Sequence, residues 1–168
     1  MRRSWVRIPL QAPAPDREDP LSPDDCLVCA ELDGRVAVPG GAIAETPLAV
    51  AIHLPPLPDR PDPYAGHLLV CPRRHAAGFA DLSDDEARDV GALIARASRA
   101  LRAEAATRVY TATIGHGVEH LHVHVIARWP ETPDDVAWNA VDEWPGARRL
   151  DADGVAALAA RLAGVARR

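Results

Sequence analysis

The chain has 168 residues and a formal net charge of −5 at pH 7 with histidine counted as neutral. This length fits one domain with its own core, and the mild negative charge argues against a nucleic acid as a stable partner. Lysine is absent, which excludes Schiff-base chemistry and enzymes that work through a lysine–nucleotide adduct. The sequence contains no apolar run of the roughly eighteen residues that would indicate a membrane-spanning helix.

The N-terminal residues 1–24 begin with basic residues, but prolines and a further arginine interrupt any apolar segment of the kind a secretory signal needs. We expect residues 1–24 to be a disordered leader. Three cysteines do not make a disulfide framework, and without a signal peptide the cytoplasm is the expected compartment.

The first half of the ordered chain reads as strands separated by loops. The pair Cys26 and Cys29 in "CLVC" forms a knuckle before a short strand in "RVAV". A glycine turn then leads into a longer strand, "AIAETPLAVAIHL", and a hairpin is the simplest connection between the two. The proline-rich stretch 55–65 has no periodicity and predicts an exposed loop.

The second half combines strands with two helices. "GHLLVCPRRH" predicts a strand that begins near His67 and ends at Pro72, with His75 just beyond its end. Ser83 and Glu86 form a capping box, and the apolar residues that follow have helical spacing. Residues 108–129 read as two strands joined by loop 115–119, and "DADGVAALAARLAG" predicts a shorter helix. The fold class is therefore α+β.

The stretch "HLHVHVI", residues 120–126, places three of the seven histidines at alternate positions. In a strand His120, His122 and His124 would share one face, and the β-branched valines favour a strand over a helix. The alternative is a solvated polar face that happens to use histidine, but arginine, threonine or glutamate would serve such a face at least as well. Because three adjacent imidazoles cannot all be charged cheaply at neutral pH, some should be neutral and available as nucleophile, acid, base or ligand.

Two kinds of chemistry suit these imidazoles. Neutral imidazole is a common metal ligand, and a cysteine pair lies upstream; one strand histidine for the metal and the others for chemistry is the economical division. A neutral imidazole can also attack phosphorus. In the loop "IGHGV", Gly115 and Gly117 flank His116, and their backbone N–H groups can approach phosphate oxygens closely.

"HLHVHVI" matches the signature of the histidine-triad (HIT) superfamily, "GHLLVCPRRH" resembles the family segment that precedes the long helix, and "CLVC" resembles the cysteine pair of many bacterial members. The resemblance covers residues from about Cys26 to Arg128. It implies an antiparallel sheet of about five strands with one long helix and a C-terminal helix. We therefore expect a HIT domain over residues 25–130 and a tail over 131–168 whose short helix packs on it.

The resemblance also implies roles for individual residues. His122 would be the nucleophile that forms a nucleotidyl-histidine intermediate, and His124 and His67 would contact the phosphate oxygens and assist proton transfer. A structural zinc ion would be held by four side chains: Cys26, Cys29, His75 and His120. The candidate substrate contacts are Gly115, Gly117, His116 and His53, although His116 could be solvated and His53 could be an ordinary surface residue.

This chain departs from the family pattern at three places around the expected binding site. Leu54 lies near the place of an aspartate that binds ribose, so that either Asp59 or Asp62 reaches in or ribose is held differently. The strand before the glycine loop reads "YTATIG", where many members have an asparagine, and Gly117 replaces a small hydroxyl residue. Outside these positions, we expect Trp129, Trp138 and Trp144 to lie in the core. Three arginines could attract an anionic substrate or could be exposed residues without a function: Arg73, Arg74 and Arg128.

The expected activity is hydrolysis at the α-phosphate of a nucleotide conjugate, either a dinucleoside polyphosphate or a nucleoside phosphoramidate. A nucleotidylyltransferase or phosphorylase is an alternative, but related transferases usually have glutamine where this chain has His124. A nucleotide-binding protein with little turnover is another. The resemblance further suggests a homodimer, with a small nucleotide as the substrate and neither a nucleic acid nor a membrane as a partner.

Overall fold

The computed structural model describes residues 24–115 and 117–167. Apart from Asp24, the expected leader lies outside these residues. The elements, in chain order, are α1 (Leu27–Leu32), β1 (Ala42–Glu45), β2 (Ala49–His53), β3 (His67–Pro72), the 3₁₀ turn η1 (Phe79–Asp81), α2 (Asp84–Ala103), β4 (Arg108–Ala112), β5 (Val123–Arg128), the 3₁₀ turn η2 (Trp138–Ala140) and α3 (Ala152–Ala166). The predicted α+β class is confirmed.

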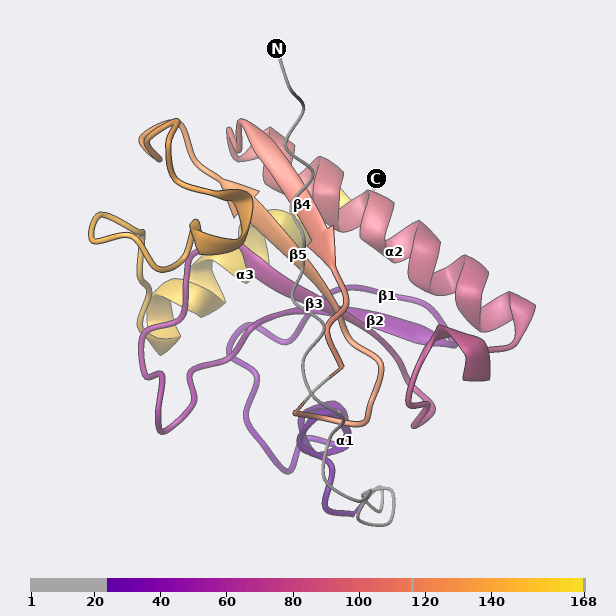
Figure 1. The fold of residues 1–168 in the computed structure, drawn as a ribbon. Coiled ribbons are helices and arrows are strands. Elements are labelled where there is room, and N and C mark those ends of the chain that lie inside the picture. The colour runs from indigo at the N-terminus through magenta and orange to yellow at the C-terminus, as the bar shows by residue number, and fades with distance from the viewer. Residues whose placement is uncertain (1–23, 116, 168) are drawn as a thin grey trace, which may run out of the picture.

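The five strands form one antiparallel sheet in the order β1-β2-β3-β5-β4. The central strand β3 is buried along its whole length, and it pairs with β5 so that Leu69 lies opposite His124. This register places His67, at the start of β3, beside the histidine of β5. Figure 1 shows the long helix α2 running along the sheet and the short helix α1 lying apart from α2.

Side-chain alternation along the strands divides the interior into two cores. Leu68 and Val70 point to the face covered by α2 and α3, where they join the larger core with Leu93 and Leu162. The large helix therefore buries the apolar stripe that its sequence predicted. The predicted capping box is also confirmed, since the side chains of Ser83 and Glu86 each accept a hydrogen bond from the other's backbone N–H.

The opposite face of the sheet carries a smaller core. Leu69 and Cys71 of β3 and Val50 of β2 point to this face, where they pack against Cys26 and Val28 at the start of α1. The N-terminal knuckle is thus fastened to the face of the sheet that the long helices leave uncovered.

Two expectations for the N-terminal half were wrong. The cysteine pair opens a helix and is not followed by a strand: the Cys26 sulfur accepts a hydrogen bond from the Cys29 N–H and caps α1, which contains Cys29. Residues 33–41 form no strand. The longer strand is in fact the hairpin of β1 and β2, since the Thr46 hydroxyl accepts a hydrogen bond from the Ala49 N–H at 2.9 Å and closes the turn.

The strand expected over residues 120–126 begins three residues late, at Val123. Tertiary contacts hold the preceding residues out of the sheet: the Leu121 N–H donates to the Ala76 carbonyl at 2.7 Å, and the His120 ring bonds to the Pro72 carbonyl. As a result, the three histidines do not share one surface.

The C-terminal segment packs on the sheet through α3, whose Asp151 cap accepts a hydrogen bond from the Gly154 N–H. Of the three tryptophans expected in the core, Trp129 is buried, but Trp138 is 51% exposed and Trp144 is half-buried. Trp138 instead lies near the Tyr110 ring of β4. Within the described residues, every helix is too short or too polar to cross a membrane.

Candidate active site and metal centre

The histidines gather into two clusters. His120 lies beside His75, with ring centroids 5.1 Å apart, next to the cysteine knuckle. His124 lies between His67 and His122, at centroid distances of 5.1 and 4.9 Å. Because β5 begins only at Val123, the chain turns His120 toward one cluster and leaves His122 and His124 for the other.

The first cluster brings together the four predicted metal ligands, which we call the Cys2His2 cluster: Cys26, Cys29, His75 and His120. One ligand atom from each lies within 4.8 Å of the other three. The Cys29 sulfur is 3.4 Å from Nδ1 of His75 and 3.3 Å from Nδ1 of His120, and the Cys26 sulfur is 3.7 Å from the latter. A tetrahedral zinc site has sulfur–nitrogen edges of about 3.5 Å, so the donor atoms fit that ion.

The tautomer of His120 suits metal binding. Its Nε2 lies 2.9 Å from the carbonyl oxygen of Pro72, an acceptor, so the proton is on Nε2. The lone pair of Nδ1 therefore faces the two sulfurs. A hydrogen bond from the far ring nitrogen to a carbonyl is the usual way in which proteins orient a metal-binding imidazole.

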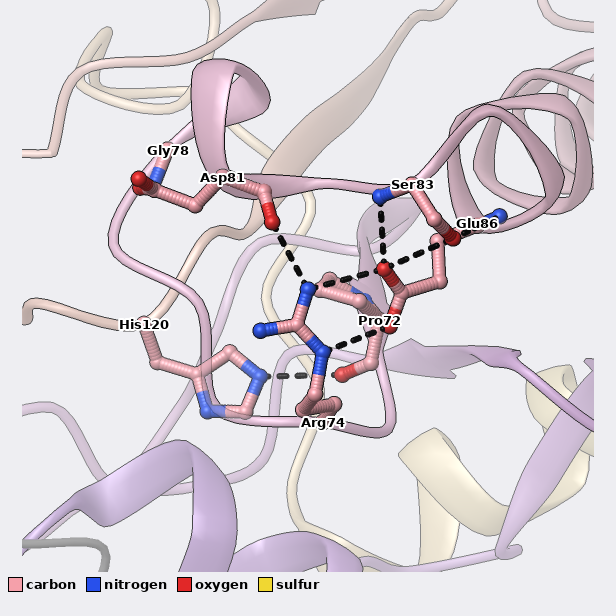
Figure 2. A network of polar contacts seen from close by, with 7 residues as sticks. All are labelled: Pro72, Arg74, Gly78, Asp81, Ser83, Glu86 and His120. Atoms are coloured by element: carbon pink, nitrogen blue, oxygen red, sulfur yellow. Dashed lines mark hydrogen bonds and ion pairs between the residues drawn. The ribbon is translucent and has the colours of Figure 1, made fainter.

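An ion pair holds the segment that carries His75. Arg74 donates two hydrogen bonds to the carboxylate of Glu86, at 2.9 and 2.8 Å, and another to the Asp81 carbonyl at 2.7 Å. Figure 2 shows this network beside the bond from His120 to Pro72. The same contacts lower the pKa of Glu86 to about 2, because Arg74 and the Ser83 N–H both stabilise its carboxylate. The start of α2 is thereby tied to the metal-ligand segment.

In the absence of a metal, the surroundings of Cys29 disfavour its thiolate. Burial, the hydrogen bond to Cys26 and the nearby Cys26 sulfur raise the pKa of Cys29 to about 11. A bound divalent cation supplies the charge that would stabilise the thiolates. A closed set of four ligands, with no position left for water or substrate, is typical of a structural zinc site.

The second cluster contains the predicted nucleophile, and a backbone contact sets its tautomer. Nδ1 of His122 lies 2.7 Å from the carbonyl oxygen of His120, so Nδ1 carries the proton and Nε2 carries the lone pair. The ring is only partly buried. Its Nε2 is therefore the ring nitrogen with a lone pair left for chemistry.

The other two imidazoles of this cluster are joined to each other. Nε2 of His67 is 2.9 Å from Nδ1 of His124. Burial and, to a smaller extent, the neighbouring imidazoles lower the pKa of His67 to about 3 and that of His124 to about 4. Both rings are thus neutral at pH 7.

The predicted substrate contacts differ in their exposure to solvent. Gly115 and Gly117 are exposed next to the histidine segment, and Gly115 has φ +68°, a left-handed conformation that suits glycine. His116 lies outside the described residues. His53 is fully buried; its Nδ1–H donates to the Leu54 carbonyl, and its Nε2 accepts from the Gly66 N–H. Because neither ring nitrogen is free, this geometry contradicts a contact between the His53 ring and substrate.

The three arginines considered as attractors of an anion are engaged within the protein. Arg73 binds Glu45, and Arg74 binds Glu86. Arg128 is buried, and it donates to the Val136 carbonyl at 2.9 Å and to the Pro133 carbonyl. Its role is to hold the tail.

Asp142 is a site residue that sequence reasoning missed. Its Oδ2 lies 3.9 Å from Nδ1 of His67. It comes from an irregular part of the tail, where no motif or periodicity points to the active site.

Comparison with known proteins assigns the family. The model of the HIT domain matches residues 38–131, more than half of the chain, and the protein therefore belongs to the HIT family.

Among its relatives is the adenosine 5'-monophosphoramidase of Schizosaccharomyces pombe, which is 29% identical over 120 residues, covering 64% of this chain and 85% of that protein. A zinc-bound histidine triad family protein from Mycobacterium smegmatis has a similar fold, with a TM-score of 0.63, 23% identity and coverage of 85% of this chain and 96% of the other. A hypothetical histidine triad nucleotide-binding protein from Sulfolobus tokodaii has a TM-score of 0.60, 18% identity and coverage of 84% and 92%.

Proposed function

We propose that the protein is a hydrolase that cleaves a nucleotide conjugate at the α-phosphate through a nucleotidyl-His122 intermediate. The observation that carries this proposal is the bond from the His122 ring to the His120 carbonyl, which leaves Nε2 as an unprotonated nucleophile. The S. pombe relative, named for its action on an adenosine phosphoramidate, supports the same reaction class.

In the first step Nε2 of His122 attacks the α-phosphorus and forms a P–N bond. The bond from phosphorus to the leaving group breaks, and the leaving group departs with its electron pair. An anhydride oxygen leaves as an anion, whereas an amine takes up a proton from water. Gly115 and Gly117 are exposed, and their N–H groups would donate to phosphate oxygens.

In the second step water attacks the phosphorus of the intermediate, and the bond to Nε2 breaks. The nucleoside monophosphate leaves, and His122 regains its lone pair. His124 is adjacent and neutral, so it is the candidate base that takes the proton of the attacking water.

The metal has no step in this reaction. Zinc in the Cys2His2 cluster would fix His120, two residues before the nucleophile, and would tie α1 to the sheet. Its closed ligand set supports a structural role.

The proposal includes a cytoplasmic homodimer. Strand β4 is an edge of the described sheet and leaves one side of its backbone available for pairing. Light scattering on the purified protein would give twice the chain mass if this is correct, and a monomer mass would exclude it.

The test is to mix the protein with adenosine 5'-phosphoramidate or a diadenosine polyphosphate and to follow AMP release together with intact mass. Wild type should release AMP and pass through a nucleotidyl adduct on His122, and the faster substrate identifies the preferred bond. His122→Ala should lose turnover and the adduct but should still bind nucleotide.

Arg99→Ala is a matched control, since Arg99 is exposed on α2, on the opposite face of the sheet from His124. Its rates should equal those of wild type. Full activity in His122→Ala would disprove the mechanism, and transfer of the nucleotidyl group to added phosphate in place of water would identify a phosphorylase.

A further inference from the structure

One buried nitrogen in the cluster of His67, His122 and His124 has no hydrogen-bond partner among the described residues. His67 is only 5% exposed, and its Nδ1 makes no hydrogen bond to any of the described residues. Oδ2 of Asp142 is the carboxylate oxygen that faces it, at 3.9 Å. A displacement of about 1 Å would bring the pair to hydrogen-bond distance.

The fold fixes the place of Asp142. Its neighbour Val141 is fully buried in the larger core, and Arg149 donates a hydrogen bond to the Asp142 carbonyl. The Arg149 segment in turn pairs with the chain that leads into β3, where Tyr64 and Arg149 form a bridge. The backbone that carries the carboxylate is therefore anchored to the chain just before His67.

The carboxylate selects the tautomer of His67. A carboxylate that faces an imidazole nitrogen repels a lone pair and attracts an N–H group. The proton of His67 consequently belongs on Nδ1, and Nε2 carries the lone pair.

The tautomer of His67 determines the tautomer of His124. Since Nε2 of His67 is an acceptor, Nδ1 of His124 must be the donor in their 2.9 Å contact. The remaining nitrogen of His124, Nε2, then carries a lone pair. That is the form a base needs.

We propose that Asp142 is a positioning residue that fixes the Nδ1–H tautomer of His67 and, through it, keeps Nε2 of His124 ready to accept the proton of the hydrolytic water. When His124 takes that proton, the new positive charge is shared along a chain of two imidazoles that ends at a carboxylate. This role rests on the proposed function, and it acts on the second step, in which the P–N bond to His122 breaks. Attack by His122 in the first step does not need it.

The test compares Asp142→Leu, which removes the acceptor and keeps the branching at Cγ, with Asp142→Asn, which retains an oxygen acceptor. Glu143→Gln removes the same charge from the exposed neighbouring residue and is the matched control. The first readout is the tautomer of His67, from ¹⁵N NMR of protein labelled on histidine, with His67→Gln used to assign the signal. Wild type, Asp142→Asn and Glu143→Gln should show Nδ1–H, and Asp142→Leu should lose this preference.

The second readout separates the two chemical steps in a single turnover. In Asp142→Leu, hydrolysis of the adduct should slow about 10- to 100-fold and the adduct should accumulate, while its formation changes less than about threefold. Asp142→Asn should lie between this variant and wild type.

An unchanged His67 tautomer in Asp142→Leu would overturn the inference, as would equal slowing of both steps. If Asp142→Leu does not fold, an Nε2–H tautomer of His67 in wild type or a full wild-type hydrolysis rate in Asp142→Asn would overturn it. Failure of the proposed function is a separate result, because wild type would then release no AMP and form no adduct. The NMR measurement would still test whether Asp142 sets the tautomer of His67.

Discussion

Gly66 is the residue at which a single methyl group should cost most near the active site. Its φ is +82°, and a Cβ atom there would lie 2.8 Å from a Trp129 ring carbon and 3.0 Å from the Ala127 Cβ. Both neighbours are buried, and the Trp129 N–H donates to the Ala65 carbonyl. Neither can move away easily.

The magnitude for Gly66→Ala follows from two costs. A left-handed conformation costs a non-glycine residue roughly 1–2 kcal/mol, and overpacking of a filled core costs about 1–3 kcal/mol. We therefore expect the free energy of unfolding to fall by about 2–5 kcal/mol. His67 follows directly in the chain, so catalytic activity should also fall.

The assay is urea unfolding followed by circular dichroism, with an unchanged slope as evidence of two-state behaviour. Gly91→Ala is the matched control: Gly91 lies inside α2, its Cβ would meet no atom within 4 Å, and alanine should stabilise this helix by about 0.5–1 kcal/mol. A loss below about 1 kcal/mol in Gly66→Ala would refute the reasoning from steric contact.

Three further predictions concern the metal, a buried histidine and pH. Loss of a residue that only hydrogen-bonds to a metal ligand typically lowers metal affinity roughly 10- to 100-fold, and Cys29→Ser, which removes a ligand itself, should lower zinc affinity by more. Metal content and competition with a chelator measure this change, and unchanged zinc binding would contradict the site. His53→Leu should destabilise the protein by about 1–3 kcal/mol for each of the two backbone groups that it leaves unbonded in the interior, and urea unfolding that shows no loss would exclude a structural role. Because burial lowers the pKa of His67 to about 3, only the unfolded chain binds a proton at this residue between that pH and about 6.5. Stability should therefore fall as pH falls from 6.5 to 5, and His67→Gln should reduce this slope by at most about 1.4 kcal/mol per pH unit; an equal slope in both proteins would show that His67 does not titrate in this way.

Local patterns in the sequence predicted what local interactions decide. The Ser83 and Glu86 pair marked the start of α2, and the apolar run before Pro72 predicted the strand β3. The helix after Cys26 was missed because a thiol cap depends on an N–H···S bond that composition does not reveal.

Contacts between distant segments account for the remaining differences. His120 leaves the strand pattern because its ring bonds to the carbonyl of Pro72, 48 residues away in sequence. His53 was expected either to contact substrate or to be an ordinary surface residue, but it is buried and its ring accepts a hydrogen bond from the Gly66 N–H. Asp142 lies in an irregular tail that Arg128 and Arg149 position, and neither interaction has a sequence signature.

The division of the interior into two cores on opposite faces of the sheet has a consequence for how the molecule opens. The smaller core contains fewer residues than the larger one, and on its outer side it is covered by α1, a helix of only six residues. If the Cys2His2 cluster holds zinc, its removal should let α1 detach and expose this face while the larger core beneath α2 and α3 stays closed. Amide hydrogen exchange should then show two levels of protection, with the N-terminal segment exchanging by a partial opening that leaves the rest of the protein folded.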